Sequence, residues 1–300
     1  MVTTTSDQAD VRGGLRLRIS RALYQRPRLR LTLFLGAPLV WLLVIYIGAL
    51  VAMLVTSVYH FQDDPTGLIT RLVTSPSTTN YHRVLDTAVY RTVAFRTIGA
   101  ALTVTAIDLV IALPVAFFMA KIAGPWLRRA LVVAVTMPLW AGYLVKGYAW
   151  RAILDPAGGV LHEVFGHSPG FSLQGTVITL AYLWLPYMII PIYAGLERLP
   201  NSLLEASTDL GAKAGRTFVS VVLPQLRPSI VAGSIFTFAL TLGDFYMAQI
   251  VGGTTQFIGN VIYREFSANL PFAAAYATLP IVIMLVYLLA ARSSGALEEL

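Results

Sequence analysis

The sequence contains no cysteine, so disulfides, thiol catalysis and cysteine-ligated metal sites are excluded. Charged residues are scarce, at 12% of the 300 residues, whereas about a quarter is usual in soluble domains. No G-x-x-x-x-G-K-[ST] phosphate loop is present, so we expect no nucleotide hydrolysis, no catalytic residue and no bound cofactor in this chain. The histidines are scattered without the spacing of metal ligands: His60, His82, His162 and His167.

Hydrophobic residues supply 56% of the chain and the mean hydropathy is +0.69, values that indicate a polytopic membrane protein. Six apolar segments approach or exceed the ~20 residues that a helix needs to cross a bilayer. Their ranges are 33–57, 92–120, 129–150, 173–196, 229–251 and 273–292. We therefore predict an all-α fold with six transmembrane helices in a domain of residues 31–300. Prolines in these spans favour bent helices around a pathway, although bending for packing alone explains each one equally well.

The basic residues are distributed unevenly between the two sides of the predicted bundle. Of the 22 Lys and Arg residues, 15 lie on the side of the N-terminal tail, residues 1–30, and seven of those are in the tail itself. Such an excess marks the cytoplasmic side, and an even number of spans places both termini there. The tail also explains the net charge of +7, which we assign to contact with the lipid bilayer and not with nucleic acid.

A polar island at 199–224 separates the fourth and fifth spans, so it is predicted to be cytoplasmic. Ser202 followed three residues later by Glu205 is typical of a capping box at a helix start. Gly211 is well placed to end that helix in a left-handed conformation. A second amphipathic run follows and is predicted to stop at Pro224, which lacks a backbone donor. The island therefore has the pattern of two short helices that form a rigid protrusion.

Asp108 and Asp244 are the acidic residues inside the predicted spans, where an ionisable side chain is costly and normally faces a cavity or a partner. They either line a cation pathway or form a hydrogen bond or ion pair within the bundle, for instance with Lys146. Asp108 lies near the middle of the second span and Asp244 in the outer half of the fifth. Aromatic faces can hold ammonium groups along such a pathway, or they simply anchor the helices at the membrane interface. These aromatic residues are Trp140, Tyr143, Trp184, Tyr187 and Tyr246.

The island resembles the EAA loop of bacterial ABC importer permeases, whose pattern is E-A-A-x3-G-x9-I-x-L-P. The matching residues here are Glu205, Ala206, Gly211, Leu223 and Pro224, with Ser207 in place of the second alanine and Val221 in place of the isoleucine. Asp209, in the interval before Gly211, is expected to take part in ATPase coupling with them. The resemblance implies the type I ABC importer permease fold in a bacterial inner membrane. It also implies that this loop is a coupling helix that docks on a separate ATPase subunit.

A longer stretch, within residues 137–266, resembles permeases of the spermidine/putrescine type. It includes the run from Met137 to Trp150, Leu185-Pro186-Tyr187, Gly243-Asp244-Phe245 and Ile258-Gly259-Asn260. Three positions depart from that pattern: Lys146 replaces an arginine, Ala248 a proline, and Asp108 an apolar residue. The resemblance implies a polyamine as solute. From the cost of intramembrane charge and the affinity of aromatic faces for ammonium groups, we expect the pathway to be formed by Asp108, Trp140, Tyr143, Lys146, Tyr187, Asp244 and Tyr246.

The same resemblance implies the partners of such a machine. These are a second, homologous permease subunit, two ATPase subunits that hold ATP and Mg²⁺, and an extracytoplasmic solute-binding protein. Two alternatives stay open. The same architecture could import an anionic solute such as an opine or phosphonate, for which Lys146 is a better ligand than Asp244. An ion-coupled secondary carrier would instead use Asp108 or Asp244 as a proton or ion relay.

Overall fold

A computed structural model describes residues 27–63 and 70–293 of the chain. Most of the predicted basic tail, residues 1–26, lies outside the described residues. The chain divides into two units, residues 1–55 and 56–300, which are described separately. Helix α2 (Pro27–Ser57), whose last two residues belong to the second unit, contains the predicted span 33–57, and large apolar side chains between Phe34 and Val55 are exposed. A helix that is hydrophobic all round is suited to a membrane.

The second unit begins with a small element that sequence analysis did not predict. Strands β1 (His60–Asp63) and β2 (Thr70–Val73) form an antiparallel pair in which His60 is opposite Val73. Helix α3 (Thr79–Asp86) follows. The side chain of the buried Asn80 donates hydrogen bonds to the carbonyls of Ser57, at 3.1 Å, and Tyr59, at 2.6 Å. This contact fixes α3 against the end of the preceding helix.

Three long helices form the centre of this unit and make its most extensive helix contacts: α4 (Ala88–Phe117), α8 (Leu173–Arg198) and α12 (Arg227–Leu242). They confirm the predicted spans 92–120 and 173–196, and α4 is prolonged by a π-helical segment, η1 (Phe118–Ile122). Small residues of α4, such as Ala112 and Ala116, pack in one buried cluster with Met188 and Ile192 of α8. Some buried threonines bond their own helix; Thr179, for example, donates to the Gly175 carbonyl at 2.8 Å.

The third predicted span, 129–150, is wrong as a single helix. The structure has α5 (Pro125–Trp140) and α6 (Tyr143–Ile153), which meet at 96°, followed by the short α7 (Val160–Phe165). Ala141 and Gly142 between them are extended, with ψ of 138° and 136°. Pro138 lies three residues before this break. Because proline has no backbone N–H to donate, it weakens the end of α5.

The fifth predicted span, 229–251, is also divided. Helix α12 ends at Leu242, and α13 (Tyr246–Val251) is a separate helix beyond Gly243 and Asp244. Asp244 therefore lies in the break between two helices. The prediction that it lies within a continuous fifth span is wrong. Helix α14 (Ile258–Ala268), which was not predicted, precedes α15 (Leu270–Ser293), and α15 confirms the predicted span 273–292.

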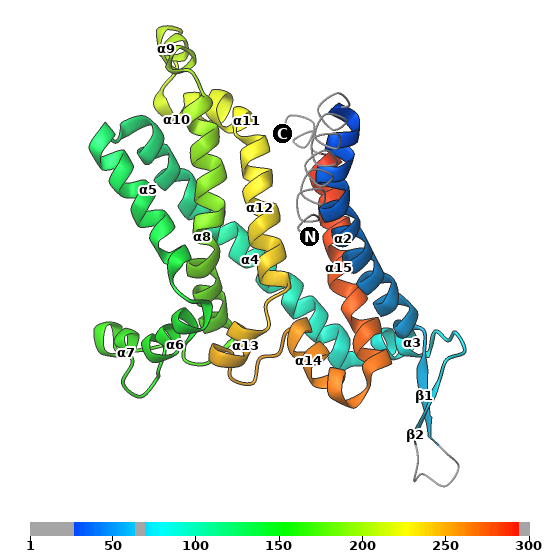
Figure 1. Cartoon of the computed structure of the whole chain (residues 1–300). Helices are drawn as coiled ribbons and strands as arrows, with labels where there is room; N and C mark the ends of the chain where they lie inside the picture. The colour runs from blue at the N-terminus through cyan, green and yellow to red at the C-terminus, as the bar shows by residue number, and fades with distance from the viewer. Residues whose placement is uncertain (1–26, 64–69, 294–300) are drawn as a thin grey trace, which may run out of the picture. The chain divides into compact units, whose positions relative to one another are not determined.

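The described residues include four helices long and apolar enough to cross a membrane, and up to six spans if each of the two bent helix pairs is one span. Apart from the β1–β2 hairpin, the regular secondary structure of the described residues is helical, which confirms the predicted fold class. In the second unit, the polar island, with helix α9 (Asn201–Asp209), lies at one end of the central helices. Helices α6, α7, α13 and α14 lie at the opposite end (Figure 1).

Candidate functional site

Helix α9 forms the exposed tip of the polar island. The helix begins directly after Pro200, which is its N-cap residue and provides no side-chain hydrogen bond. The predicted Ser202–Glu205 capping box is therefore wrong. The reason is that Pro200 ends the segment leaving α8 and Asn201 already belongs to the helix, which leaves Ser202 inside the first turn. Lys121 of η1 binds this start instead, because its Nζ donates to the Leu199 carbonyl at 2.6 Å and to the Asn201 Oδ1 at 3.0 Å.

The other end of α9 has the predicted glycine stop. Gly211 has φ of +79°, in the left-handed region. Its N–H donates to the Thr208 carbonyl at 2.8 Å, while the N–H of Ala212 donates to the Ser207 carbonyl at 3.1 Å. This pair of bonds is a Schellman motif, which satisfies the last carbonyls of the helix.

The segment after the glycine is longer and more continuous than predicted. It consists of α10 (Ala214–Thr217), a π-helical turn η2 (Phe218–Val222) and α11 (Leu223–Gln225), so Pro224 does not end it. A proline in a helix leaves an earlier carbonyl without its donor, and the wider π turn before Pro224 accommodates this. The bend comes at Leu226, where α12 departs at 68°.

The residues of the EAA-like pattern divide into an exposed tip and a half-buried base. Glu205, Ala206, Asp209 and Gly211 are exposed, whereas Leu223 and Pro224 are half-buried at the base. Ser207 is half-buried because its hydroxyl lies 2.9 Å from the hydroxyl of the buried Thr217. Sequence analysis missed Leu210, which is 89% exposed beside Gly211 and gives the tip an apolar surface next to its two carboxylates.

At the opposite end of the unit, Asp244 joins two broken spans. It is 5% exposed, and its Oδ2 accepts a hydrogen bond from the hydroxyl of Tyr143 at the start of α6. Its Oδ1 accepts from the backbone N–H of Met247 at 2.8 Å, so the carboxylate also caps α13. Asp244 thus forms a hydrogen bond within the bundle, as one of the two interpretations predicted, with Tyr143 and not Lys146 as partner. Its place on a solute pathway stays a prediction.

Several of the predicted aromatic residues form one continuous ladder. Tyr143 stacks on Trp184 with ring centroids 5.8 Å apart and an interplanar angle of 19°. Tyr246 meets Tyr143 edge-on at 6.5 Å, and Tyr187 meets Trp184 edge-on at 5.9 Å. The ladder ends at Phe236 of α12, 6.4 Å from Tyr187. We call these five rings, Tyr246, Tyr143, Trp184, Tyr187 and Phe236, the aromatic ladder.

Trp140, Lys146 and Asp108 lie off the aromatic ladder. Trp140 is 89% exposed at the end of α5, and Lys146 donates from Nζ to the Pro138 carbonyl at 3.2 Å. Asp108 of α4 is fully buried, and neither of its carboxylate oxygens has a hydrogen-bond partner among the described residues. The ion pair between Asp108 and Lys146 that the sequence allowed is absent from the described structure.

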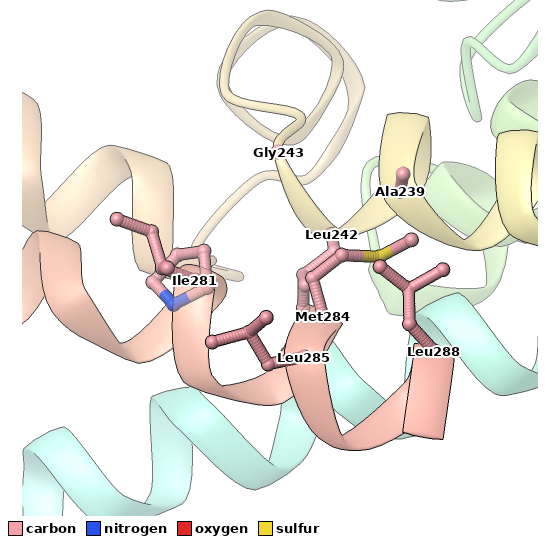
Figure 2. Close-up of a pocket in the computed structure, with 8 residues that line it drawn as sticks. Ala239, Leu242, Gly243, Ile281, Met284, Leu285 and Leu288 are labelled. Atoms are coloured by element: carbon pink, nitrogen blue, oxygen red, sulfur yellow. The ribbon is translucent and has the colours of Figure 1, made fainter. Parts of the chain in front are cut away.

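Long-range bonds hold the broken spans, and they could not be read from local sequence. Asn260 of α14 donates to the Phe245 carbonyl at 3.1 Å, 15 residues earlier in the chain. Arg151 of α6 donates to the Ile250 carbonyl at 2.5 Å. A separate cavity of about 330 Å³ lies between α12 and α15, lined by Leu242, Met284 and other apolar residues (Figure 2). It offers no charged group to a polar solute among its lining residues.

Residues 109–297 match the family described as binding-protein-dependent transport system inner membrane component. The chain is 38% identical over 303 residues to the inner membrane ABC transporter permease protein YdcU of Escherichia coli, covering 94% of this chain and 95% of that protein. It is also 34% identical over 233 residues to the spermidine/putrescine transport system permease protein PotB of Salmonella typhimurium, covering 73% of this chain and 80% of that protein.

Solved structures of ABC transporters share the fold. One is a bacterial alginate ABC transporter in complex with an alginate pentasaccharide-bound periplasmic protein, with a TM-score of 0.70 at 15% identity, covering 88% of this chain and 93% of that chain. Another is the MetNI methionine ABC transporter in an inward-facing conformation, with a TM-score of 0.55 at 19% identity over 66% of this chain and 91% of that chain. At such identities the likeness concerns the arrangement of helices alone.

Proposed function

This chain belongs to the family of binding-protein-dependent inner membrane transport components, and we propose that it is one permease subunit of an ATP-driven importer for a polyamine such as spermidine or putrescine. It is a multi-pass transport subunit of a bacterial inner membrane and not an enzyme. ATP and Mg²⁺ are held by separate ATPase subunits. The observation that carries the proposal is the geometry of α9.

Helix α9 has the properties of a coupling element. Its start is bound by Lys121, its end is closed by Gly211, and Ser207 braces it to Thr217, so a force applied to the tip reaches the central helices. The exposed Glu205 and Asp209 with the neighbouring Leu210 supply a mixed apolar and acidic surface for a partner. We assign this surface to the ATPase subunits, at the end of the unit opposite Asp244 (Figure 1).

The charge distribution supports a cytoplasmic position for that tip. The 15 basic residues on the side of the tail include those around α9, namely Arg198, Lys213, Arg216 and Arg227. By the positive-inside rule this side faces the cytoplasm, and both termini lie there too. The end that carries α6, α7, α13 and α14 then faces the extracytoplasmic binding protein.

The assembly requires partners in addition to the ATPases. The family description names dependence on a binding protein, and the alginate transporter of the same fold was captured with its periplasmic protein. We propose that a second, homologous permease subunit completes the pathway. Closure of two ATPase subunits would push α9 and rock the helices from an inward-facing to an outward-facing arrangement, after which the binding protein delivers solute.

The aromatic ladder is the proposed surface along which the solute moves. Tyr246 and Phe236 are 50% and 53% exposed, so the ladder has accessible ends on α13 and α12. Aromatic faces attract alkylammonium groups, and rings spaced 5.8 to 6.5 Å apart offer successive contacts to an extended polyamine. The hydrogen-bonded Asp244 adds negative charge beside Tyr143 and Tyr246, while Trp140 and Lys146 lie at the margin of this path.

An anionic solute is the second candidate. The name of the relative at 38% identity specifies no solute, and Lys146 is a cation near the outer end of the bundle. The alternative is an anionic solute such as an opine or phosphonate in the same architecture. An ion-coupled secondary carrier is not favoured, because the family is one of binding-protein-dependent systems.

Solute binding by the partner binding protein tests the proposal. Its affinity is measured by calorimetry for spermidine, putrescine, an opine and a phosphonate, and the preferred solute is then offered to the complete complex in proteoliposomes. We expect tight binding of a polyamine and ATP-driven uptake of it. Preference for an anionic solute would replace the polyamine assignment, and uptake without ATP would refute the importer class.

A further inference from the structure

Asp108 is the most unusual side chain in the described structure. It lies in the middle of α4, its exposed fraction is 0%, and both carboxylate oxygens lack a hydrogen-bond partner among the described residues. Asp244 differs, because Tyr143 and Met247 satisfy its two oxygens. An unpartnered buried carboxyl group stabilises nothing in the resting structure.

The neighbours of Asp108 follow from the packing on either side of it. One turn before, Val104 lies in the same buried cluster as Leu180 and Trp184 of α8. One turn after, Ala112 packs in a cluster with Met188 of α8. These contacts place Asp108 level with the stretch of α8 from Trp184 to Met188. Towards α12, Thr237 donates to Thr105 at 3.4 Å, so Asp108 lies where α4, α8 and α12 meet.

This position is energetically costly for a carboxyl group. Burying a polar group without a hydrogen bond destabilises a fold, and burying an unpaired charge does so far more. A leucine of similar size would carry no such penalty. Lys146 provides no counter-charge, since it binds the Pro138 carbonyl. A buried, ionisable residue inside a membrane protein that has no structural partner is by default a candidate for function.

Trp184 connects this position with the aromatic ladder. Its indole is 9% exposed and stacks on Tyr143, so it belongs to the ladder. Its Nε1, however, is buried and has no hydrogen-bond partner in the described part of the chain, as is true of Asp108. Trp184 is thus a ring of the ladder that also packs in one cluster with Val104, one turn before Asp108, and no hydrogen bond to a described residue holds its indole there.

We propose that Asp108 binds an alkylammonium group of the transported solute within this subunit, after Trp184 has moved aside. This inference rests on the proposed polyamine function. An ammonium group supplies the positive charge and the N–H donors that both oxygens of Asp108 lack. The same carboxylate repels anionic solutes, so the junction selects for cations.

The test uses the complete complex, with the second permease, the ATPases and the binding protein, in proteoliposomes. Uptake of spermidine and putrescine is measured against solute concentration for the wild type, Asp108→Asn and Asp108→Leu. Asp86→Asn is the matched control, because Asp86 is exposed on the outer helix α3. The melting temperature of each purified complex shows whether a variant still folds.

We expect both Asp108 variants to raise the KM for polyamine uptake about tenfold or more, the loss typical of a hydrogen bond to a charged group. The melting temperature should stay equal or rise in Asp108→Leu, since an unpartnered polar group is removed. Asp86→Asn should behave as the wild type. A melting temperature lowered in both Asp108 variants would show a structural role and overturn the proposal.

Two further outcomes separate this inference from the proposed function. Polyamine uptake by the wild type, with a KM unchanged in both variants, would refute the Asp108 site and leave the polyamine importer intact. Absence of polyamine uptake by the wild type would refute the solute assignment and the Asp108 site with it. A changed pH dependence at unchanged KM would identify proton transfer and also overturn the ammonium site.

Discussion

The hydroxyl of Ser207 on α9 lies 2.9 Å from the hydroxyl of Thr217 on α10, and this bond braces the tip of the polar island against the segment that leads into α12. Lys121 binds the other end of α9 to η1 at the end of α4. Phe117, the last residue of α4, meets Phe218 of η2 edge-on at 5.9 Å. The end of α4 is therefore in contact with η2, the π-helical turn that leads towards α12, so both α4 and α12 share a displacement of α9.

Gly211→Ala tests the left-handed end of α9. Gly211 has φ of +79° and no described atom within 4 Å of an added Cβ, so backbone strain of about 1–2 kcal/mol is the whole effect. We expect a severalfold loss of uptake per ATP hydrolysed in the reconstituted complex. Gly211→Asn is the control, because asparagine adopts this conformation more readily, and its coupling should be closer to that of the wild type.

Lys121→Met removes the cation that binds the start of α9. Each charge-assisted hydrogen bond contributes about 1.5–3 kcal/mol, so the first turn of α9 should loosen. We expect ATP hydrolysis to continue while uptake falls, which is measured as the ratio of the two rates. Lys121→Arg keeps a charged donor and should retain part of the coupling. Equal ratios in Lys121→Met and the wild type would contradict this role.

Tyr143 and Asp244 should be coupled in a double-mutant cycle. Tyr143→Phe leaves Asp244 Oδ2 without its donor, a loss of about 1–3 kcal/mol in the stability of the complex. Asp244→Asn should also weaken polyamine uptake at unchanged expression. The stability lost in the double variant should be smaller than the sum of the losses in the two single variants. The difference should exceed about 0.5 kcal/mol, as for residues in direct contact. Additive losses would show that the two side chains act independently.

Gly259→Ala tests the junction between the break after α12 and helix α14. An added Cβ would lie 2.9 Å from the Cβ of Phe245 and 3.1 Å from the backbone carbonyl of Asp244. Because these atoms are close to the backbone and cannot swing away, we expect a loss of about 1–3 kcal/mol, seen as a lower melting temperature. Gly99→Ala in α4, with nothing described within 4 Å, should be neutral or stabilising. Equal melting temperatures for the two variants would contradict the close contact of Gly259 with Asp244 and Phe245.

Much of this architecture follows from the sequence. Long apolar runs predicted α2, α4, α8 and α15, because a continuous hydrophobic stretch has no other favourable structure in a bilayer. Gly211 was predictable as a helix end, since glycine alone enters the left-handed region without a penalty.

The breaks in the third and fifth spans could not be predicted in the same way. Mean hydropathy over about 20 residues is unchanged when a helix turns by 96° at Ala141 and Gly142. The partners that stabilise such breaks are distant in sequence: Tyr143 and Asp244 are 101 residues apart. The predicted capping of α9 was wrong for a related reason. The residue that binds the start of this helix, Lys121, lies 78 residues before Leu199.

Binding-protein-dependent, ATP-driven uptake of spermidine and putrescine by proteoliposomes containing the complete complex, compared between the wild type and Glu205→Lys, tests the role of α9 most directly. Glu205 is exposed on α9, so the substitution should leave folding and membrane insertion intact while reversing the charge presented to the ATPase. We predict polyamine uptake by the wild type, and loss of both uptake and solute-stimulated ATP hydrolysis in Glu205→Lys. Wild-type uptake and coupled hydrolysis in Glu205→Lys would contradict the assignment of α9 as the coupling helix.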